Sequence, residues 1–282
     1  MPLTPAVTTI RQAQQAGSAV PLFAVFDSRN VDGIMAAAEG LRAPVIMGLY
    51  AGTLERPTGR ALAACVRTRA EESAVPIALM LDHGTTLEHC RLAIAQGFTD
   101  VMFDGSKLPL AENVARTREV VQAARAAGVA VEGELGQVGS GRDYQDFGAR
   151  GAGFTDPDTV EPFVRETGVD LLAVAIGSAH GQYAGEPHLD VDLLQELRRR
   201  TSVPLALHGG SGCAAEQFRA AIAAGIAKVN IATDLWAAAR ARVGEAARPD
   251  GASYFDLTNA IVAAFEDRCR HYLEVFGAAG RG

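Results

Sequence analysis

Three histidines stand at the ends of apolar runs in the sequence. His83 follows the run "VPIALMLD" at 75–82, His180 follows "LLAVAIGS" at 171–178, and His208 lies in "VPLALHGG" at 203–210. If these runs are strands of one barrel, their C-terminal ends meet at one face, where three imidazoles can bind zinc and leave its fourth position open. A lone histidine at a strand end is more often a hydrogen-bonding residue than a ligand, so spacing alone leaves both interpretations open.

Acidic and glycine-rich segments accompany the histidines. Asp82 directly precedes His83, at a position where packing alone asks for no acid. Asp104 ends the next run, and Glu132 and Glu134 lie in the one after it. The segments "HGGSG" at 208–212 and "NIAT" at 230–233 follow the last two runs, where barrels commonly bind phosphate through backbone N–H groups. Together these residues suggest a metal, an acid/base carboxylate and a phosphate site at one face.

Eight strand-like runs are available to position these residues. Stretches with apolar residues at three- and four-residue spacing separate the runs, as in helices that cover a sheet. This alternation favours parallel strands buried on both faces, and eight units predict an α/β protein with a (β/α)8 TIM barrel as a single domain, 1–282. A doubly wound open sheet is the alternative fold. The runs lie at 19–26, 43–50, 75–82, 100–105, 129–136, 171–178, 203–210 and 227–234.

One long irregular stretch, 136–157, interrupts this pattern. It is glycine-rich and polar, and it follows the fifth run, where a barrel builds its site. Loops of this length inside a compact domain are usually functional, so we expect an active-site lid rather than a simple surface insertion.

Composition excludes several classes of partner. The 282 residues are 48% hydrophobic and 21% charged with a net charge of -7, and no basic block appears, which argues against nucleic acid and anionic membranes. The four cysteines form no C-x-x-C pair, so neither a disulfide framework nor a cysteine zinc site is indicated. The sequence shows no membrane span and no secretory signal, and we expect a cytoplasmic protein.

The motifs, taken in order, resemble those of a known family. "LDHG", "FDGS", "VEGELG", "DLLAVAIGSAHGQY", "LALHGGSG" and "KVNIATD" are similar to motifs of the class II, zinc-dependent ketose-bisphosphate aldolases, of the fructose- and tagatose-bisphosphate type. The resemblance runs from "AVPLF" to "VFGAAGRG", nearly the whole chain, and "PVIMGLYAGT" is closer to the tagatose branch.

This resemblance implies a function and a set of site residues. It implies an aldolase that reversibly cleaves a ketose phosphate to dihydroxyacetone phosphate, or a related ketone, and an aldehyde. Asp82 would be the catalytic acid/base, and Asp104 and Glu134 acidic residues near the metal. It further implies a sodium or potassium ion beside the phosphate, a small phosphorylated sugar as partner, and a homodimer or homotetramer. The implied zinc ligands are His83, His180 and His208, and the implied phosphate-binding residues are Gly181, Gly209, Gly210, Ser211, Asn230, Ala232 and Thr233.

Four positions depart from the family pattern. Ala24 stands where Asn is usual, Arg142 where the mobile loop carries a Glu, Ala184 where a phosphate-contacting Lys is common, and Trp236 where fructose-specific members have Arg. Drift compensated by neighbours such as Asp143 is one interpretation. The other is a substrate shifted away from fructose 1,6-bisphosphate, with Arg142 as an anchor for an anionic group and Trp236 facing an apolar or ring-bearing group.

Two alternative functions stay open at this stage. One is an epimerase, isomerase or lyase that uses the same zinc-enediolate chemistry. The other is a catalytically inactive barrel that binds a sugar phosphate, although the presence of Asp82 argues against it.

Overall fold

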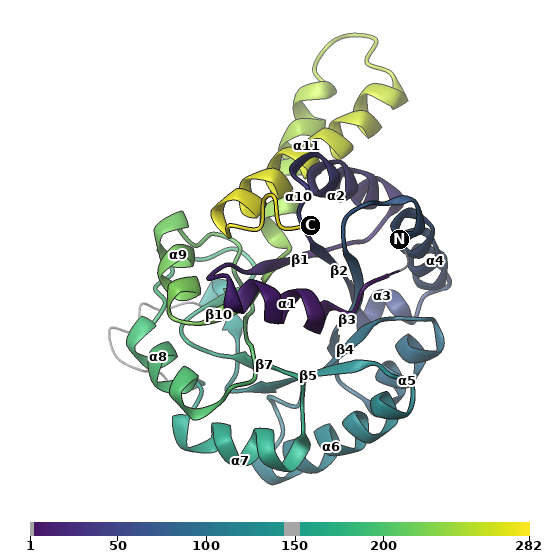
Figure 1. Ribbon diagram of the computed structural model, residues 1–282. Coiled ribbons are helices and arrows are strands. Elements are labelled where there is room, and N and C mark those ends of the chain that lie inside the picture. The colour runs from purple at the N-terminus through teal and green to yellow at the C-terminus, as the bar shows by residue number, and fades with distance from the viewer. Residues whose placement is uncertain (1–2, 144–152) are drawn as a thin grey trace.

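Eight parallel strands close into a barrel in the computed structural model, which describes residues 3–143 and 153–282 (Figure 1). The strand order around the barrel is β1-β10-β9-β7-β5-β4-β3-β2. Each barrel strand overlaps one of the eight runs predicted from the sequence. The TIM barrel is therefore confirmed, and the open sheet is excluded.

Helices alternate with the barrel strands and surround them (Figure 1). The barrel strands are β1 (Val20–Ala24), β2 (Val45–Tyr50), β3 (Ile77–Gly84), β4 (Asp100–Phe103), β5 (Ala130–Leu135), β7 (Leu171–Val174), β9 (Leu205–Leu207) and β10 (Ile226–Ile231). A separate two-stranded sheet pairs β6 (Gly139–Ser140) with β8 (Ala179–His180). The helices are α1 (Ala6–Gln15), α2 (Ser28–Leu41), α3 (Ala51–Leu54), α4 (Pro57–Glu72), α5 (Leu87–Ala95), α6 (Leu110–Ala126), η1 (Gly141–Asp143), α7 (Pro157–Thr167), α8 (Val191–Arg200), α9 (Ala215–Ala223), α10 (Thr233–Ala246) and α11 (Tyr254–Val275).

Barrel strands bury side chains on both faces, which explains their continuous apolar sequences. In β1, Leu22 belongs to a small cluster inside the barrel, whereas its neighbour Phe23 belongs to the large cluster between strands and helices. Because successive strand residues point to opposite faces, a strand buried on both sides has no polar alternation. A polar residue in such a strand is therefore a sign of function or of a buried partner.

Helix α1 covers the N-terminal end of the barrel (Figure 1). Ala6, Ile10 and Ala13 on its buried face join the cluster inside the barrel. The carboxylate of Asp100 accepts hydrogen bonds from the backbone N–H groups of Ala6 at 2.7 Å and Val7 at 3.2 Å, and so satisfies donors at the start of the helix. Access to the barrel interior is thereby closed at this end and left to the opposite one.

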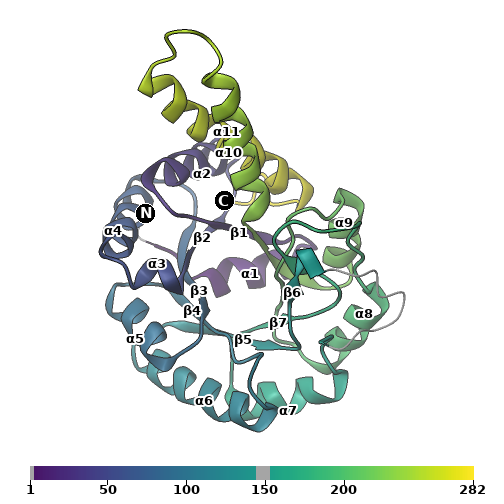
Figure 2. The same cartoon turned by 180° about the vertical axis from the view of Figure 1, so that it is seen from behind.

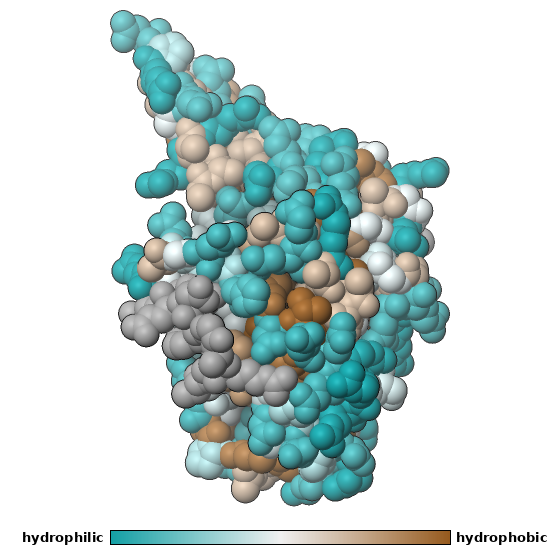
Figure 3. Space-filling view, turned by 90° about the vertical axis from the view of Figure 1, so that its left-hand side faces the viewer, coloured by the Kyte–Doolittle hydropathy of each residue, from teal (hydrophilic) through white to brown (hydrophobic). Residues whose placement is uncertain are grey.

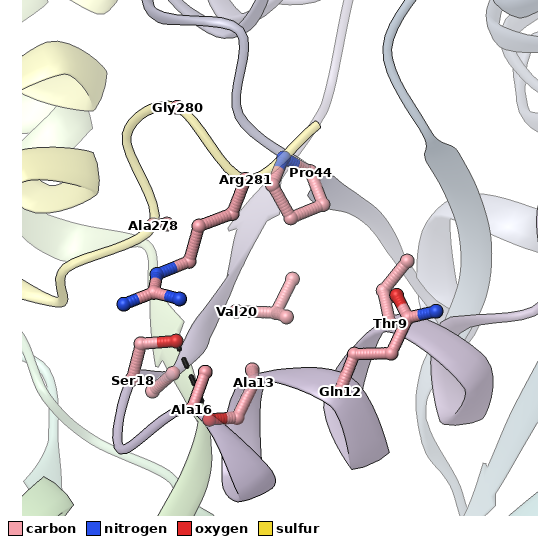
Figure 4. A pocket seen from close by; sticks show the side chains of 11 residues that line it. Thr9, Gln12, Ala13, Ala16, Ser18, Val20, Pro44, Ala278, Gly280 and Arg281 are labelled. Carbon is pink, nitrogen blue, oxygen red and sulfur yellow. Dashed lines mark hydrogen bonds between the residues drawn. The ribbon is translucent and has the colours of Figure 1, made fainter.

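A cavity lies at this closed end, between α1 and the C-terminal turn (Figure 4). Its volume is about 320 Å³. The guanidinium of Arg281 and the hydroxyl of Ser18 lie on one side of it, and Thr9 and Gln12 on the other. The described residues that line it include no acid and no histidine. The chemistry expected from the sequence therefore belongs to the other end of the barrel.

Helices α10 and α11 form an arm that stands away from the barrel (Figures 1 and 3). Near its base, α11 packs closely on α2, where a Cβ on Gly33 would lie 2.6 Å from the Cβ of Phe265. At its tip, Tyr254 and Phe255 are exposed. None of the helices in the described residues combines the length and the apolar character that crossing a membrane requires.

A buried ion pair spans the barrel interior. Lys228 on β10 places its Nζ 2.9 Å from Oε2 of Glu132 on β5, and both side chains are completely buried. The two strands are not neighbours in the barrel. An unpaired charge at this depth would be strongly unfavourable, so each residue depends on the other.

Replacing one partner of this pair should therefore cost more than replacing both. We expect Lys228→Met to lower the free energy of unfolding by about 3–5 kcal/mol, because it leaves the Glu132 carboxylate buried without a counter-charge. Adding Glu132→Gln removes that charge and should recover a substantial part of the loss. Urea unfolding of the two single variants and the double variant measures the coupling. If the single effects simply add in the double variant, the ion pair is not a coupled unit.

Candidate metal centre and active site

Polar residues predicted from the strand ends line one large cavity. It lies at the end of the barrel that faces the viewer in Figure 2, opposite α1. Its volume is about 770 Å³. Its lining includes Asp82, His83, Asp104, Glu134 and His180. His208 is completely buried directly beneath this group.

The end of β3 places two adjacent side chains, Asp82 and His83, in the same cavity. In a regular strand these neighbours would point to opposite faces. The pairing of β3 with β4 shifts register between Leu81 and Gly84, and His83 has a left-handed backbone with φ 51°. Such a conformation costs a non-glycine residue about 1–3 kcal/mol and is characteristic of functional sites. The run predicted from the sequence ends at Asp82, which is two residues too early because the irregularity extends the strand through Gly84.

Three imidazoles converge at this point. Ring nitrogens of His83, His180 and His208, one from each residue, lie within 4.8 Å of one another. The nearest pair is His83 Nε2 and His208 Nδ1, at 3.0 Å. His180 comes from β8, outside the barrel sheet, and is the most exposed of the three. The structure thus brings together the three histidines that the sequence singled out.

Carboxylates fix the tautomers of two of these rings. His83 Nδ1 is 2.9 Å from Oδ2 of Asp104, and His208 Nε2 is 2.7 Å from Oε1 of Glu132. When each of these nitrogens donates its proton to a carboxylate, the remaining nitrogens are the two that face each other. Metal-binding histidines commonly have such a carboxylate partner, which orients the ring and raises its basicity.

The charges around His83 favour a cation. Burial lowers the pKa of His83, but the carboxylates of Asp82, Asp104 and Glu134 outweigh it and raise the pKa to about 9. Burial, followed by the charge of Asp104, raises the pKa of Glu134 to about 8. Its Oε2 is buried without a hydrogen-bond partner and lies 4.0 Å from Nδ1 of His83. Three imidazoles beside acidic groups are a donor set that suits zinc, which would replace the proton on His83 when it binds.

Asp82 is oriented by an amide that also contacts the histidine cluster, since Nδ2 of Asn230 lies 3.3 Å from Nδ1 of His208. Its Oδ1 accepts a hydrogen bond from Nδ2 of Asn230 at 2.9 Å and lies 4.0 Å from Nε2 of His83. Asn230 is on β10, so an amide from the far side of the barrel mouth orients the acid. The carboxylate therefore lies near the imidazole nitrogens, but at 4.0 Å it is too far from His83 to form a hydrogen bond with it.

The glycine-rich turns after the later strands form one wall of the same cavity. Gly181 and Gly209 have positive φ angles of 92° and 67°, and a Cβ on Gly209 would lie 2.5 Å from the carbonyl oxygen of Ala179. Ser211 Oγ accepts hydrogen bonds from the backbone N–H groups of Ala232 at 3.3 Å and Asp234 at 3.2 Å. Helix α10 begins at Thr233, and although Ser211 takes the N–H of Asp234, the positive end of the helix still suits an anion.

Six of the seven predicted phosphate residues line this cavity, and Gly210 does not. A Cβ on Gly210 would lie 2.9 Å from the Cγ1 of Val229, so this glycine allows close packing below the turn. The carboxylate of Asp234, which could repel an anion, instead accepts hydrogen bonds from Arg268 and from the hydroxyl of Tyr272 at 2.8 Å. The six are Gly181, Gly209, Ser211, Asn230, Ala232 and Thr233.

The specificity candidates divide into two groups. Trp236 and Ala24 line the cavity, whereas Arg142 in η1 is exposed and lies outside its lining, as does Ala184. Within the predicted lid, 136–157, the backbone carries β6 and η1, and Ala184 donates its N–H to the carbonyl of Gly141 at 2.9 Å. Residues 144–152 of that stretch, and the side chain of Asp143, lie outside the described residues.

Several residues of the site escaped the sequence analysis. The supporting role of Glu132 could have been suspected, since it shares a strand face with Glu134 two positions later. Lys228 in the middle of an apolar strand was a second signal. Phe26 and Tyr50, which also line the cavity, carried no sequence signal of their own.

Comparisons with known proteins agree with this geometry. Residues 5–281 match the model of the family described as class-II fructose-bisphosphate aldolase. A probable fructose-bisphosphate aldolase of Bacillus subtilis (strain 168) is 40% identical over 255 residues, covering 89% of each chain. The fructose-bisphosphate aldolase of Geobacillus stearothermophilus is 40% identical over 228 residues, covering 80% of this chain and 79% of the relative.

Solved structures show the same barrel. The YdjI aldolase from Escherichia coli K12 superimposes with a TM-score of 0.88 at 31% identity and 99% coverage of both chains. A fructose-1,6-biphosphate aldolase described as putative, from Coccidioides immitis, gives 0.87 at 27% identity, covering 98% of this chain and 97% of the other. The match extends along nearly the whole chain in both kinds of comparison, and the chain therefore belongs to the class II fructose-bisphosphate aldolase family, a family of aldehyde-lyases.

Proposed function

We propose that this protein is a zinc-dependent aldolase that reversibly cleaves a ketose phosphate to dihydroxyacetone phosphate, or a related ketone, and an aldehyde. One observation carries the proposal: ring nitrogens of three histidines, two with tautomers set by carboxylates, meet beside Asp82 at the cavity that Asp82, His83 and His180 line. The glycine-rich turns of the same cavity supply backbone donors suited to a phosphate.

His83, His180 and His208 would hold the zinc ion, with Asp104 and Glu134 beside them. The two nitrogens that face each other at 3.0 Å are unfavourable as paired acceptors unless a proton or a cation lies between them. When bound, zinc supplies Lewis-acid polarisation of the substrate's ketone oxygen. The carboxylate partners of His83 and His208 keep the donor nitrogens aimed at one point.

Asp82 would perform the proton transfer. Breaking the C3–C4 bond of a ketose turns the C4 hydroxyl into an aldehyde carbonyl, so the oxygen on C4 must lose its proton. The Asp82 carboxylate, oriented by Asn230, accepts this proton and returns it in the addition direction. Because Asp82 and His83 are adjacent on one rigid strand end, the base and the metal keep a fixed separation.

The phosphate site and the predictions about the lid, the oligomer and the location complete the proposal. The substrate's phosphate would bind between the turns after β9 and β10 and the start of α10, with a sodium or potassium ion beside it. The lid at 136–157, substrate contact by Arg142 and Asp143, a homodimer or homotetramer and a cytoplasmic location stay predictions from the sequence.

Substrate choice would be shifted away from fructose 1,6-bisphosphate. Ala184 and Trp236 stand where the family pattern has cations, and Ala24 replaces an amide. Trp236 and Ala24 both line the cavity, so their replacement changes the surface that a substrate meets. Lys107 is the one lysine or arginine among the described residues lining the cavity.

Zinc content tests the metal assignment. We expect about one zinc per chain in metal-replete protein, and a marked loss in His83→Ala, His180→Ala and His208→Ala, because each removes one of three protein ligands. The matched control is His271→Ala, which alters an exposed histidine on α11. Elemental analysis with circular dichroism separates zinc loss from unfolding. Full zinc occupancy in folded His180→Ala would contradict the assignment.

The role of Asp82 is tested by Asp82→Asn. We expect turnover to fall by about 10²–10⁴, the usual contribution of a general acid/base, while zinc content and melting temperature stay unchanged. Steady-state release of dihydroxyacetone phosphate is the measurement. If the variant kept more than about a tenth of the turnover, Asp82 would not be the base.

A pair of ketose phosphates tests the substrate shift. Fructose 1-phosphate and fructose 1,6-bisphosphate differ only in the distal phosphate, and both release dihydroxyacetone phosphate. In an enzyme adapted to the bisphosphate, the distal contact is worth about 10–100-fold in kcat/KM. We expect no such advantage here, because Trp236 replaces the cation. A bisphosphate advantage of that size would show that the departures are drift.

A further inference from the structure

Three large aromatic side chains are exposed at the rim of the active-site cavity. Phe26, Tyr50 and Trp236 are 40%, 49% and 42% exposed, and all three line the cavity. The rings of Phe26 and Trp236 meet edge to face, with centroids 4.9 Å apart and planes at 78°. We call these three residues the aromatic rim.

The aromatic rim occupies one continuous sector of the barrel mouth. Phe26 follows β1, Tyr50 ends β2, and Trp236 lies in the first turn of α10, directly after β10. Strands β10, β1 and β2 are consecutive neighbours in the barrel. Leu22 and Ala24 of β1 continue this sector deeper into the cavity. Clustered exposed aromatic side chains usually indicate a binding surface rather than chance exposure.

This sector lies between the two ends of the proposed chemistry. On one side, Tyr50 is the register partner of Asp82 on the neighbouring strand β3. On the other, Trp236 is one helical turn beyond Thr233 of the proposed phosphate site. A ketose with its phosphate at the glycine-rich turns and its C4 hydroxyl at Asp82 would direct the carbons beyond C4 toward the aromatic rim.

The charges at the rim do not suit an anion. No lysine or arginine of the described residues lines the sector formed by β10, β1 and β2. Lys107 follows β4, on the other side of the strand that carries Asp82. Arg29 is near Phe26 in sequence, but its Nη2 donates a hydrogen bond to the hydroxyl of Tyr254 on the arm, at 2.7 Å. A phosphate here would lose water without gaining a charged partner.

We infer that the aromatic rim binds the aldehyde half of the substrate, and that this half is unphosphorylated and presents an aromatic or CH-rich face. The inference rests on the proposed aldolase function and names the class of aldehyde. Aromatic rings bind such faces through apolar contact and offset or edge-on stacking, whereas they give a phosphate no charge-assisted hydrogen bond.

Addition of aldehydes to dihydroxyacetone phosphate tests the selectivity. In this reaction C3 of the ketone loses a proton and forms a bond to the aldehyde carbon, while the π bond of the aldehyde carbonyl opens and its oxygen gains a proton. We expect phenylacetaldehyde and glyceraldehyde to react with kcat/KM at least equal to that of glyceraldehyde 3-phosphate. Trp236→Arg should shift the ratio toward the phosphorylated aldehyde by about 10–100-fold, the value of one charge-assisted hydrogen bond.

Two further variants control for this effect. Tyr50→Ala should weaken the reaction of phenylacetaldehyde more than that of glyceraldehyde. Phe255→Ala, which removes a more exposed ring at the tip of the arm, should leave the ratio between aldehydes unchanged. A clear preference of the unaltered enzyme for glyceraldehyde 3-phosphate would overturn the inference, and loss of that preference in Arg142→Ala would place the anchor on Arg142 instead.

Fluorescence provides a readout that does not depend on turnover. Trp236 is the only tryptophan of the chain, so its emission reports directly on the aromatic rim. We expect 2-phenylethanol, an unreactive counterpart of phenylacetaldehyde, to change this emission saturably, and glycerol 3-phosphate to change it less. Tyr50→Ala should weaken the 2-phenylethanol response, and Phe255→Ala should preserve it.

The two readouts separate the two proposals. Saturable 2-phenylethanol binding without reaction of any aldehyde would contradict the aldolase function and leave the aromatic rim as a binding surface. Aldol addition with no response of Trp236 to 2-phenylethanol would support the aldolase function and overturn the assignment of the rim.

Discussion

A buried chain of polar contacts supports the rest of this site. Lys228 neutralises Glu132 inside the barrel, Glu132 orients His208, and the free nitrogen of His208 faces His83 at 3.0 Å. Each step depends on the one below it, since a carboxylate without Lys228 would be an uncompensated charge in an apolar interior. The ion pair supports the site because a His208 ring with contacts at both nitrogens is oriented more accurately than a surface histidine could be.

The second constraint is local and concerns the backbone of β3. The strand can offer Asp82 and His83 to one cavity only by interrupting its regular pairing with β4 and holding His83 in a left-handed conformation. The hydrogen bond from His83 to Asp104 on the next strand end helps to hold that strained residue. The same carboxylate therefore stabilises the backbone geometry and selects the tautomer. Its pKa is held below the ordinary range, since hydrogen bonds from His83 and Ser106 outweigh the effect of burial.

The sequence was sufficient for features that repeat or that contradict their surroundings. Eight apolar runs predicted the barrel, and the histidines could be placed because a polar residue at the end of a buried strand has no packing role. The aromatic rim could not be predicted as a unit, because Phe26, Tyr50 and Trp236 are far apart in the chain and only Trp236 departs from the family pattern. The ion pair between Lys228 and Glu132 was also missed, because a partner across the barrel leaves no periodic trace. The position of Arg142 outside the cavity lining depends on the path of a loop, which follows from tertiary contacts such as that between Gly141 and Ala184.

The two halves of the cavity rest on different kinds of structure. Asp82, His83, His208 and Asn230 are held by strands and joined to one another by hydrogen bonds. Phe26, Tyr50 and Trp236 lie at the rim and contact solvent. Their backbone link to the proposed catalytic residues runs through Tyr50, which is the register partner of Asp82 on the neighbouring strand. With the proposed function, substitution at the rim would alter which aldehyde is bound without altering proton transfer by Asp82. A barrel built in this way can retain carbon–carbon bond cleavage while its substrate changes, and the departures from the family pattern at Ala24 and Trp236 lie in this adaptable half.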